Sequence, residues 1–246
     1  MNKYFNRHLK YSVVLTVKAV LLDLDGTVVK LRYRYTEAKM EVFRLLEANG
    51  VPRRILEPKR SLYENLRQVE RYLKTRGIPE EYERLLRLSL RVAERYEVEA
   101  ALEAEPVEGV YETLKRLRSM GLKLALITNN GSKPTKLTLS KLRLDGFFHL
   151  VVTRDHVGSM KPDPKPIEYA LSRLGVDRRT AVMVGDSPID VKAALASGIV
   201  PIAVASGVGS VKALRETGAR YIIDQITELP ALLERIRGKP RSGVWL

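Results

Sequence analysis

The sequence predicts an α/β protein: a Rossmann-like core with a parallel sheet and helices on both faces, carrying an inserted all-α cap domain. Three observations lead to this prediction. From residue 106 onward, short apolar segments alternate with amphipathic segments of helix length, which is typical of a parallel, layered sheet. An isolated apolar strand precedes them at residues 18–24. Between these two parts lies a charged stretch, residues 31–105, whose apolar residues recur at helical spacing.

The expected first strand, residues 18–24, runs into two carboxylates, Asp23 and Asp25. Side chains alternate between the two faces of a strand, so these carboxylates would share a face if the strand continued. Gly26 follows and allows the backbone to turn sharply. Two like charges this close require that one of them is neutral or that both meet a cation. The end of this strand is therefore a candidate functional site.

The charged stretch predicts three helices, at residues 36–49, 61–76 and 79–99. Thr36 is a candidate N-cap of the first helix, because a threonine side chain can accept a hydrogen bond from the first turn. The apolar spacing predicts that the helices pack on one another. Residues 51–60 contain two prolines and predict a loop. The loop carries four cations that either contact an anionic leaving group or are solvated: Arg53, Arg54, Lys59 and Arg60.

The later elements follow in strict alternation. Helices are expected at residues 106–120, 133–144, 164–174, 188–196, 208–217 and 228–236, and strands at residues 122–128, 148–153, 181–185, 199–204 and 221–223. The predicted divisions are a basic N-terminal extension at 1–17, the core at 18–30 and 106–237, the cap at 31–105, and a tail at 238–246 that contains Trp245.

The composition excludes several functions. The chain has no cysteine, which excludes disulfides, thiolate metal sites and cysteine nucleophiles. More than half of the net charge of +14 lies near the chain ends, because residues 1–18 and 235–246 each hold four basic and no acidic residues. Short basic tails are usually solvated, so we do not expect nucleic-acid binding. We find no targeting or membrane segment and expect a cytoplasmic protein, with monomer and homodimer both open.

Polar clusters follow four of the predicted strands. They are, in chain order, Asp23 with Asp25, Thr128 with Asn129, Lys161, and Asp186 with Asp190. Each cluster alone has an ordinary explanation as a turn, a helix cap or a surface residue. Ligand sites of open α/β sheets gather at the carboxyl ends of the strands. The recurrence of such clusters after successive strands therefore predicts one shared site.

This set of clusters resembles the haloacid dehalogenase superfamily of hydrolases. The matching segments are Asp23-Leu24-Asp25-Gly26-Thr27, Leu126-Ile127-Thr128-Asn129, Lys161-Pro162, and Gly185-Asp186 through Asp190. The resemblance spans residues 18–230. The helical stretch between the first two motifs is similar to the α-helical cap of the phosphoglycolate-phosphatase-like branch. Lys30 departs from the pattern, since family members often have an acidic residue there.

The resemblance implies a Mg²⁺-dependent phosphatase that hydrolyses a small, phosphoglycolate-like phosphorylated metabolite through an aspartyl-phosphate. It implies that Asp23 is the nucleophile and Asp25 the proton carrier. It further implies that Thr128, Asn129 and Lys161 bind the phosphoryl group. The implied Mg²⁺ ligands are the Asp23 and Asp186 side chains and the Asp25 carbonyl. Asp190 would bind the metal directly, bind it through water, or orient Lys161.

Three alternatives stay open at the level of sequence. A phosphomutase would pass the phosphoryl group to a second hydroxyl instead of to water. A metal-free dehalogenase could use the same scaffold, although it has no alkoxide leaving group for Asp25 to protonate. A non-catalytic binding protein is the third alternative, and the intact set of polar residues weighs against it.

Overall fold

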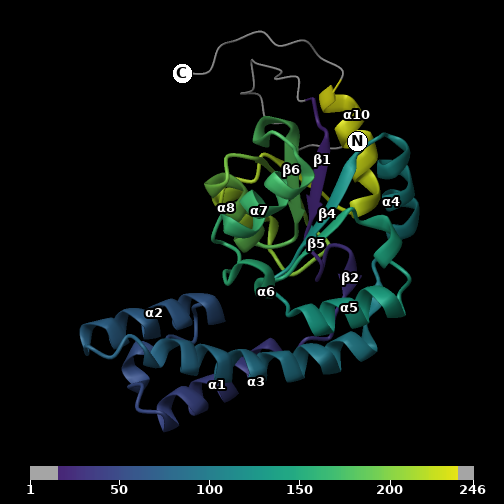
Figure 1. Ribbon diagram of the computed structural model, residues 1–246. Coiled ribbons are helices and arrows are strands. Elements are labelled where there is room, and N and C mark those ends of the chain that lie inside the picture. The colour runs from purple at the N-terminus through teal and green to yellow at the C-terminus, as the bar shows by residue number, and fades with distance from the viewer. Residues whose placement is uncertain (1–15, 238–246) are drawn as a thin grey trace, which may run out of the picture.

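The computed structural model describes residues 16–237 (Figure 1). Most of the predicted N-terminal extension and the whole predicted tail with Trp245 lie outside the described residues. The described chain forms a layered α/β core and a separate group of three helices beyond one end of the sheet.

The core is a parallel sheet of six strands in the order β5-β4-β1-β6-β7-β8. Their bounds are β1 Ala19–Leu22, β4 Lys123–Ile127, β5 Leu150–Val152, β6 Ala181–Gly185, β7 Val200–Val204 and β8 Tyr221–Ile223. The strand β1 lies between β4 and β6, and Leu22 is in register with Leu126 and Val184. The carboxyl ends of these three central strands therefore meet at one edge of the sheet, as the sequence predicts.

Alternation along the strands separates two apolar layers. Val20 and Leu22 of β1 belong to the layer beneath α4 (Val110–Ser119) and α10 (Leu229–Arg237). Ala19 and Leu21 point to the opposite face, against α7 (Lys165–Leu174) and α8 (Pro188–Ala196). All four strand residues are fully buried. The predicted Rossmann-like sheet with helices on both faces is thus confirmed, and Figure 1 shows the two helix pairs on either side of it.

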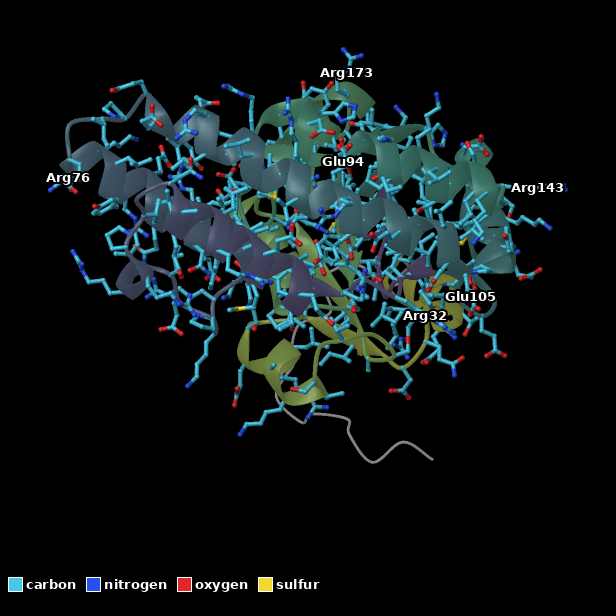
Figure 2. All side chains as sticks on the ribbon, turned by 90° about the horizontal axis from the view of Figure 1, so that it is seen from below. Arg32, Arg76, Glu94, Glu105, Arg143 and Arg173 are labelled. Atoms are coloured by element: carbon cyan, nitrogen blue, oxygen red, sulfur yellow. The ribbon has the colours of Figure 1, made fainter. Side chains whose placement is uncertain are left out.

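The group of three helices, which we call the helical unit, consists of α1 (Tyr35–Ala48), α2 (Leu62–Thr75) and α3 (Glu81–Glu103). It has its own apolar core, in which Phe43 of α1, Val69 of α2 and Leu85 of α3 are buried. The helix α3 also packs against α5 (Ser132–Lys141) of the main core. Figure 2 shows Arg76, just past α2, and Glu105, just past α3, far apart along this unit. The domain limits at residues 31–105 stay a prediction.

A short antiparallel ribbon connects the helical unit to the sheet, and the sequence did not reveal it. It pairs β2 (Val29–Lys30) with β3 (Glu105–Pro106). Each strand has only two residues, which is too short for an alternating pattern to be visible. The chain thus enters and leaves the helical unit side by side.

Several predicted boundaries are wrong. The helix α1 begins at Tyr35 with Arg34 as N-cap, so Thr36 lies inside the first turn and is not the cap. The helix expected from residue 106 begins at Val110, because Glu105–Pro106 pairs with β2. The one expected from residue 208 begins at Val211, after a Ser210 cap. A short helix, α6 (Arg154–Val157), follows β5 unpredicted, and three 3₁₀ turns flank strands or helices of the core.

The loop predicted at residues 51–60 contains a 3₁₀ turn, Arg53–Ile55. Its cations Arg53, Arg54, Lys59 and Arg60 are exposed. Arg53 pairs with Glu47 of α1 at 3.2 Å, which is a contact within the helical unit. Among residues 16–237, no helix has the length and apolar character needed to cross a membrane.

Candidate active site

The first motif forms a tight turn at the carboxyl end of β1. Gly26 adopts a φ of +77°, which an L side chain rarely does, and its N–H donates to the Val29 carbonyl at 2.8 Å. The turn brings Leu31 N–H to within 3.2 Å of Asp25 Oδ1. Asp23 is nearly buried, whereas Asp25 is partly exposed. The turn therefore places one carboxylate inside the site and the other at its edge.

Lys161 lies between two carboxylates, one just past β1 and one in the first turn of α8. Its Nζ is 2.5 Å from Asp23 Oδ1 and 2.6 Å from Asp190 Oδ1. Its exposed fraction is 2%, so the ammonium group has almost no access to water and depends on these partners for its charge balance. The structure thus brings together three residues that are separated by up to 167 positions in the sequence.

Asp190 is held from both sides. Its Oδ1 accepts from Lys161, and its Oδ2 accepts from the Ser187 hydroxyl at 2.6 Å and from the Ser187 N–H at 3.1 Å. Ser187 is the N-cap of α8, and this reciprocal pairing is a capping box. Both oxygens of Asp190 are engaged, which favours the orientation of Lys161 among its three predicted roles.

Asp186 lies in a cradle of glycines. Its Oδ2 accepts from the Val208 N–H at 2.7 Å, and its backbone carbonyl accepts from the Gly209 N–H at 3.0 Å. A Cβ on Gly26 would lie 2.2 Å from Asp186 Oδ2, and a Cβ on Gly207 would lie 2.1 Å from the same atom. Two loops therefore approach this carboxylate so closely that only glycine fits in each of them.

The loop after β4 carries Thr128 and Asn129. Thr128 is buried, and its hydroxyl oxygen accepts from the Asn130 N–H at 3.1 Å. The Asn129 side chain pairs in both directions with the backbone of Lys161: it accepts from the N–H at 2.8 Å and donates to the carbonyl at 2.9 Å. The second and third predicted motifs are thus joined directly.

Burial shifts the pKa values of the acidic residues. Desolvation raises the pKa of Asp25 to about 6 and that of Asp186 to about 6. It also raises the pKa of Asp23, which the negative charges of Asp190 and Asp186 raise further while Lys161 lowers it. Burial works against the charge of Lys161, but Asp190 and Asp23 more than offset it and raise the lysine pKa.

The acidic residues fit a hard divalent cation. Asp23, Asp186 and Asp190 each offer one carboxylate oxygen, and these oxygens lie within 4.8 Å of one another. The donors are all oxygen, which Mg²⁺ prefers over zinc-type nitrogen and sulfur sets. A cation bound there would also lower the raised pKa values of these carboxylates, because it stabilises their ionised forms. Because Asp190 already holds Lys161 and Ser187, the Asp23 and Asp186 side chains are the better ligands in this cluster.

Sequence reasoning missed four residues around this site. They are Glu97 of α3, Arg154 of α6, and Gly207 and Val208 of the loop after β7. Arg154 and Glu97 gave no signal, because each is one of many charged residues in an Arg- and Glu-rich chain. Two glycines two positions apart, Gly207 and Gly209, were the available signal for the loop, and their close approach to Asp186 explains why glycine is needed there.

The parallel sheet, the helical unit inserted after the first strand, and an acidic cluster with a buried lysine at the strand ends define a class of Rossmann-like hydrolases. The chain belongs to the haloacid dehalogenase-like hydrolase family, whose sequence model matches residues 20–204. The resemblance inferred from the motifs is thereby confirmed, and so is the prediction of an enzyme of the phosphatase type.

Relatives with assigned functions are similar over long stretches. The chain is 31% identical to a phosphoglycolate phosphatase of Cupriavidus necator, over 94% of this chain and 99% of that protein. It is 30% identical to a phosphoglycolate phosphatase of Pseudomonas savastanoi pv. phaseolicola, over 86% and 78%. It is 33% identical to the pyrophosphatase PpaX of Halalkalibacterium halodurans, over 56% of this chain and 62% of that protein.

Solved structures share the fold. A subfamily IA hydrolase of the same superfamily from Geobacter sulfurreducens is 26% identical and superposes with a TM-score of 0.54, covering 89% of this chain and 97% of that one. A haloacid dehalogenase-like protein from Streptococcus pneumoniae is 20% identical, with a TM-score of 0.62 and coverage of 88% and 98%. The second likeness bears on the fold alone.

Proposed function

We propose that the protein is a Mg²⁺-dependent phosphatase that hydrolyses a small phosphomonoester through an aspartyl-phosphate on Asp23. The observation that carries the proposal is the position of Lys161 Nζ, 2.5 Å from Asp23 Oδ1 and 2.6 Å from Asp190 Oδ1. This contact puts a buried positive charge directly beside the carboxylate that would attack phosphorus. Phosphoryl transfer depends chiefly on such positioning and charge stabilisation.

In the first step, an oxygen of Asp23 forms a bond to phosphorus, and the bond from phosphorus to the leaving oxygen breaks. A carboxylate is an established covalent nucleophile for this type of reaction. Lys161 favours the ionised form of Asp23 and counters the negative charge of the phosphoryl oxygens. Asp190 keeps the lysine charged and fixes its direction.

Asp25 is suited to move the proton. Burial raises its pKa to about 6, so near neutral pH it can exist in both protonation states. The protonated form would donate to the leaving oxygen, and the resulting carboxylate would then accept a proton from the water that attacks the aspartyl-phosphate. The hydrogen bond from Leu31 N–H to Asp25 Oδ1 holds the side chain at the edge of the site.

The loop after β4 would bind the phosphoryl oxygens. The Thr128 hydroxyl and the backbone N–H groups near Asn129 are the donors available there. The Asn129 side chain binds the Lys161 backbone instead: its amide nitrogen donates to the Lys161 carbonyl, and its oxygen accepts from the Lys161 N–H. We therefore assign it to holding Lys161 in place.

The Asp23 and Asp186 side chains and the Asp25 carbonyl would hold Mg²⁺. When bound, the ion supplies positive charge that offsets the clustered carboxylates and the phosphoryl oxygens. The glycine cradle keeps Asp186 in the orientation this requires, because Gly207 and Gly26 leave it no room to turn.

The helical unit would act as a cap over the site, with residues 31–105 as its limits. The Tyr63 hydroxyl of α2 reaches across to Asp163 Oδ2, at 3.3 Å, in the loop that carries Lys161. A cap in this place would exclude water from the intermediate and contact the leaving group. The named activities of the relatives make phosphoglycolate and inorganic pyrophosphate the first compounds to test.

The test is release of inorganic phosphate from p-nitrophenyl phosphate, with Mg²⁺ and with a chelator. We expect activity only with Mg²⁺ and none in Asp23→Asn. Asp177→Asn, which alters an exposed carboxylate before β6, at the opposite end of that strand from the site, is the matched control for Asp23→Asn. Activity that survives either the chelator or Asp23→Asn would refute the mechanism. A panel that includes phosphoglycolate and pyrophosphate then identifies the leaving group by kcat/KM.

A further inference from the structure

A buried ion pair joins the helical unit to the core. Glu97 lies on α3 and Arg154 opens α6, and Arg154 Nη1 is 2.5 Å from Glu97 Oε1. Both side chains are 4% exposed. Glu94, one turn earlier on α3, also reaches this region, since its Oε2 would lie 3.4 Å from a Cβ on Gly131.

The same two side chains hold the loop after β4 at two backbone groups. Arg154 Nη1 also donates to the Asn129 carbonyl at 2.9 Å. The second oxygen of Glu97, Oε2, accepts from the Gly131 N–H at 3.0 Å. A Cβ on Gly131 would lie 2.9 Å from Arg154 Nη2, so the absence of a side chain there allows the guanidinium to approach.

Hydrogen bonds of Asn129 connect this loop to Lys161. The Asn129 backbone is bound by Arg154, and the Asn129 side chain is bound to the Lys161 backbone through two hydrogen bonds. Lys161 Nζ in turn contacts Asp23. An unbroken series of polar contacts thus runs from a helix of the helical unit to the nucleophile.

Stability alone is a poor explanation for this pair. Burying two charges removes their hydration, and replacing a buried ion pair with apolar residues is often neutral or stabilising. Other ion pairs of α3 behave differently: Arg95 and Glu41 pair at 2.6 Å with 57% and 31% exposure, at the surface of the helical unit. Glu97 and Arg154, by contrast, are buried where they can bond the backbone of the loop after β4.

We infer that Glu97 and Arg154 are positioning residues, which fix the Thr128–Gly131 loop and, through Asn129, Lys161 in the geometry for phosphoryl transfer. This inference rests on the proposed function for its kinetic consequence. Neither side chain touches the phosphoryl group in this assignment. Their joint loss is expected to misplace the donors without removing any of them, which lowers the rate more than the affinity.

The first test is the double variant Glu97→Leu with Arg154→Met, which replaces the pair with apolar groups of similar size. We expect it to fold, with kcat for p-nitrophenyl phosphate reduced by at least about tenfold and KM within about threefold of wild type. The matched control is Glu41→Leu with Arg95→Met, which removes an exposed ion pair between α1 and α3 and should leave both constants unchanged. A double variant with wild-type kcat would overturn the inference.

The second test is amide hydrogen exchange of Asn130 and Gly131, measured with neither substrate nor Mg²⁺. We expect faster exchange in the double variant, because the Gly131 N–H loses its acceptor, and no change in the control. This measurement does not depend on activity. If the wild type releases no phosphate, the proposed function fails. If amide exchange is unchanged in the double variant, the inference about Glu97 and Arg154 is overturned. Should the double variant not fold, Arg154→Lys, which keeps the charge on a shorter side chain without the guanidinium, takes its place in the kinetic test with the same expected loss of kcat.

Discussion

Neutralising Asp186 is expected to stabilise the metal-free protein while it abolishes function. The carboxylate is 2% exposed and lies among other acidic groups. Asp186→Asn removes the charge but keeps the shape, and the asparagine Oδ1 can still accept the hydrogen bond from the Val208 N–H. The variant therefore separates the energetic effect of the buried charge from that of the packing around it.

The magnitude follows from the pKa. Burial raises the pKa of Asp186 from 3.8 to about 6. A shift of about two units corresponds to about 3 kcal/mol. Because the folded-state pKa lies above the unfolded one, ionisation disfavours the folded state: the full stability is present below pH 3.8 and is lost as the pH rises to about 6. Above that pH, Asp186→Asn should be more stable than the wild type by up to about 3 kcal/mol.

The assay is urea unfolding followed by circular dichroism between pH 4 and pH 8, in chelator and again with Mg²⁺. In chelator, the advantage of Asp186→Asn should be small at pH 4 and largest above pH 6. Added Mg²⁺ should stabilise the wild type, by relieving the charge repulsion, and leave the variant unchanged. Phosphatase activity of the variant should fall to the background.

A control of opposite sign is Asp177→Asn. Hydrogen bonds from Arg179 lower the pKa of this exposed carboxyl to about 2, so its removal should not stabilise the protein at neutral pH. The reasoning is refuted if metal-free Asp186→Asn is no more stable than the wild type at pH 7, or if its advantage does not shrink at pH 4.

Three further outcomes follow from the same geometry. Asp25→Asn should lower kcat by a factor of about 10² to 10⁴. In a pH–rate profile, kcat/KM of the wild type is expected to decline as the pH rises past about 6, and the variant should lack this decline. A decline that remains in the variant would contradict the role of Asp25 as the acid. Gly207→Ala should raise the Mg²⁺ concentration for half activity about tenfold, because its Cβ would lie 2.1 Å from Asp186 Oδ2, whereas Gly146→Ala, with open space around it, should not. Asn65→Ala should lower the free energy of unfolding in urea by about 3 kcal/mol, because this buried side chain forms hydrogen bonds with the backbone of Glu57 and two further residues. A smaller loss with normal activity would show that the loop of residues 51–60 keeps its structure without these bonds.

Much of the architecture could be predicted because it depends on local patterns. The strand β6 and the helix α8 have the predicted bounds, Ala181–Gly185 and Pro188–Ala196. Apolar runs, a proline in the first turn and glycine stops are read within a few residues, so the order of elements follows directly. The ribbon between β2 and β3 was not predicted, because each strand is two residues long and the paired residues lie 75 and 77 positions apart.

For the candidate site, too, the sequence indicated the residues but not their contacts. The residues Asp23, Asp25, Lys161 and Asp186 were identifiable because each stands in a short motif after a strand, and parallel strands bring their carboxyl ends together. Which of them touch was not identifiable. The sequence left three roles open for Asp190, and the engagement of both its oxygens by Lys161 and Ser187 favours one of them.

The sequence by itself determined the fold class, the family and the chemical groups of the site, since periodicity and motifs are properties of neighbouring residues. Only the tertiary structure decided that Glu97 meets Arg154 across 57 positions, and that Gly207 presses on Asp186. Charged residues on a helix surface all look alike in a sequence. The packing of α3 on α5 decides which charged side chains of α3 are removed from water. A charged group without water depends on hydrogen-bonding or oppositely charged partners for its stability.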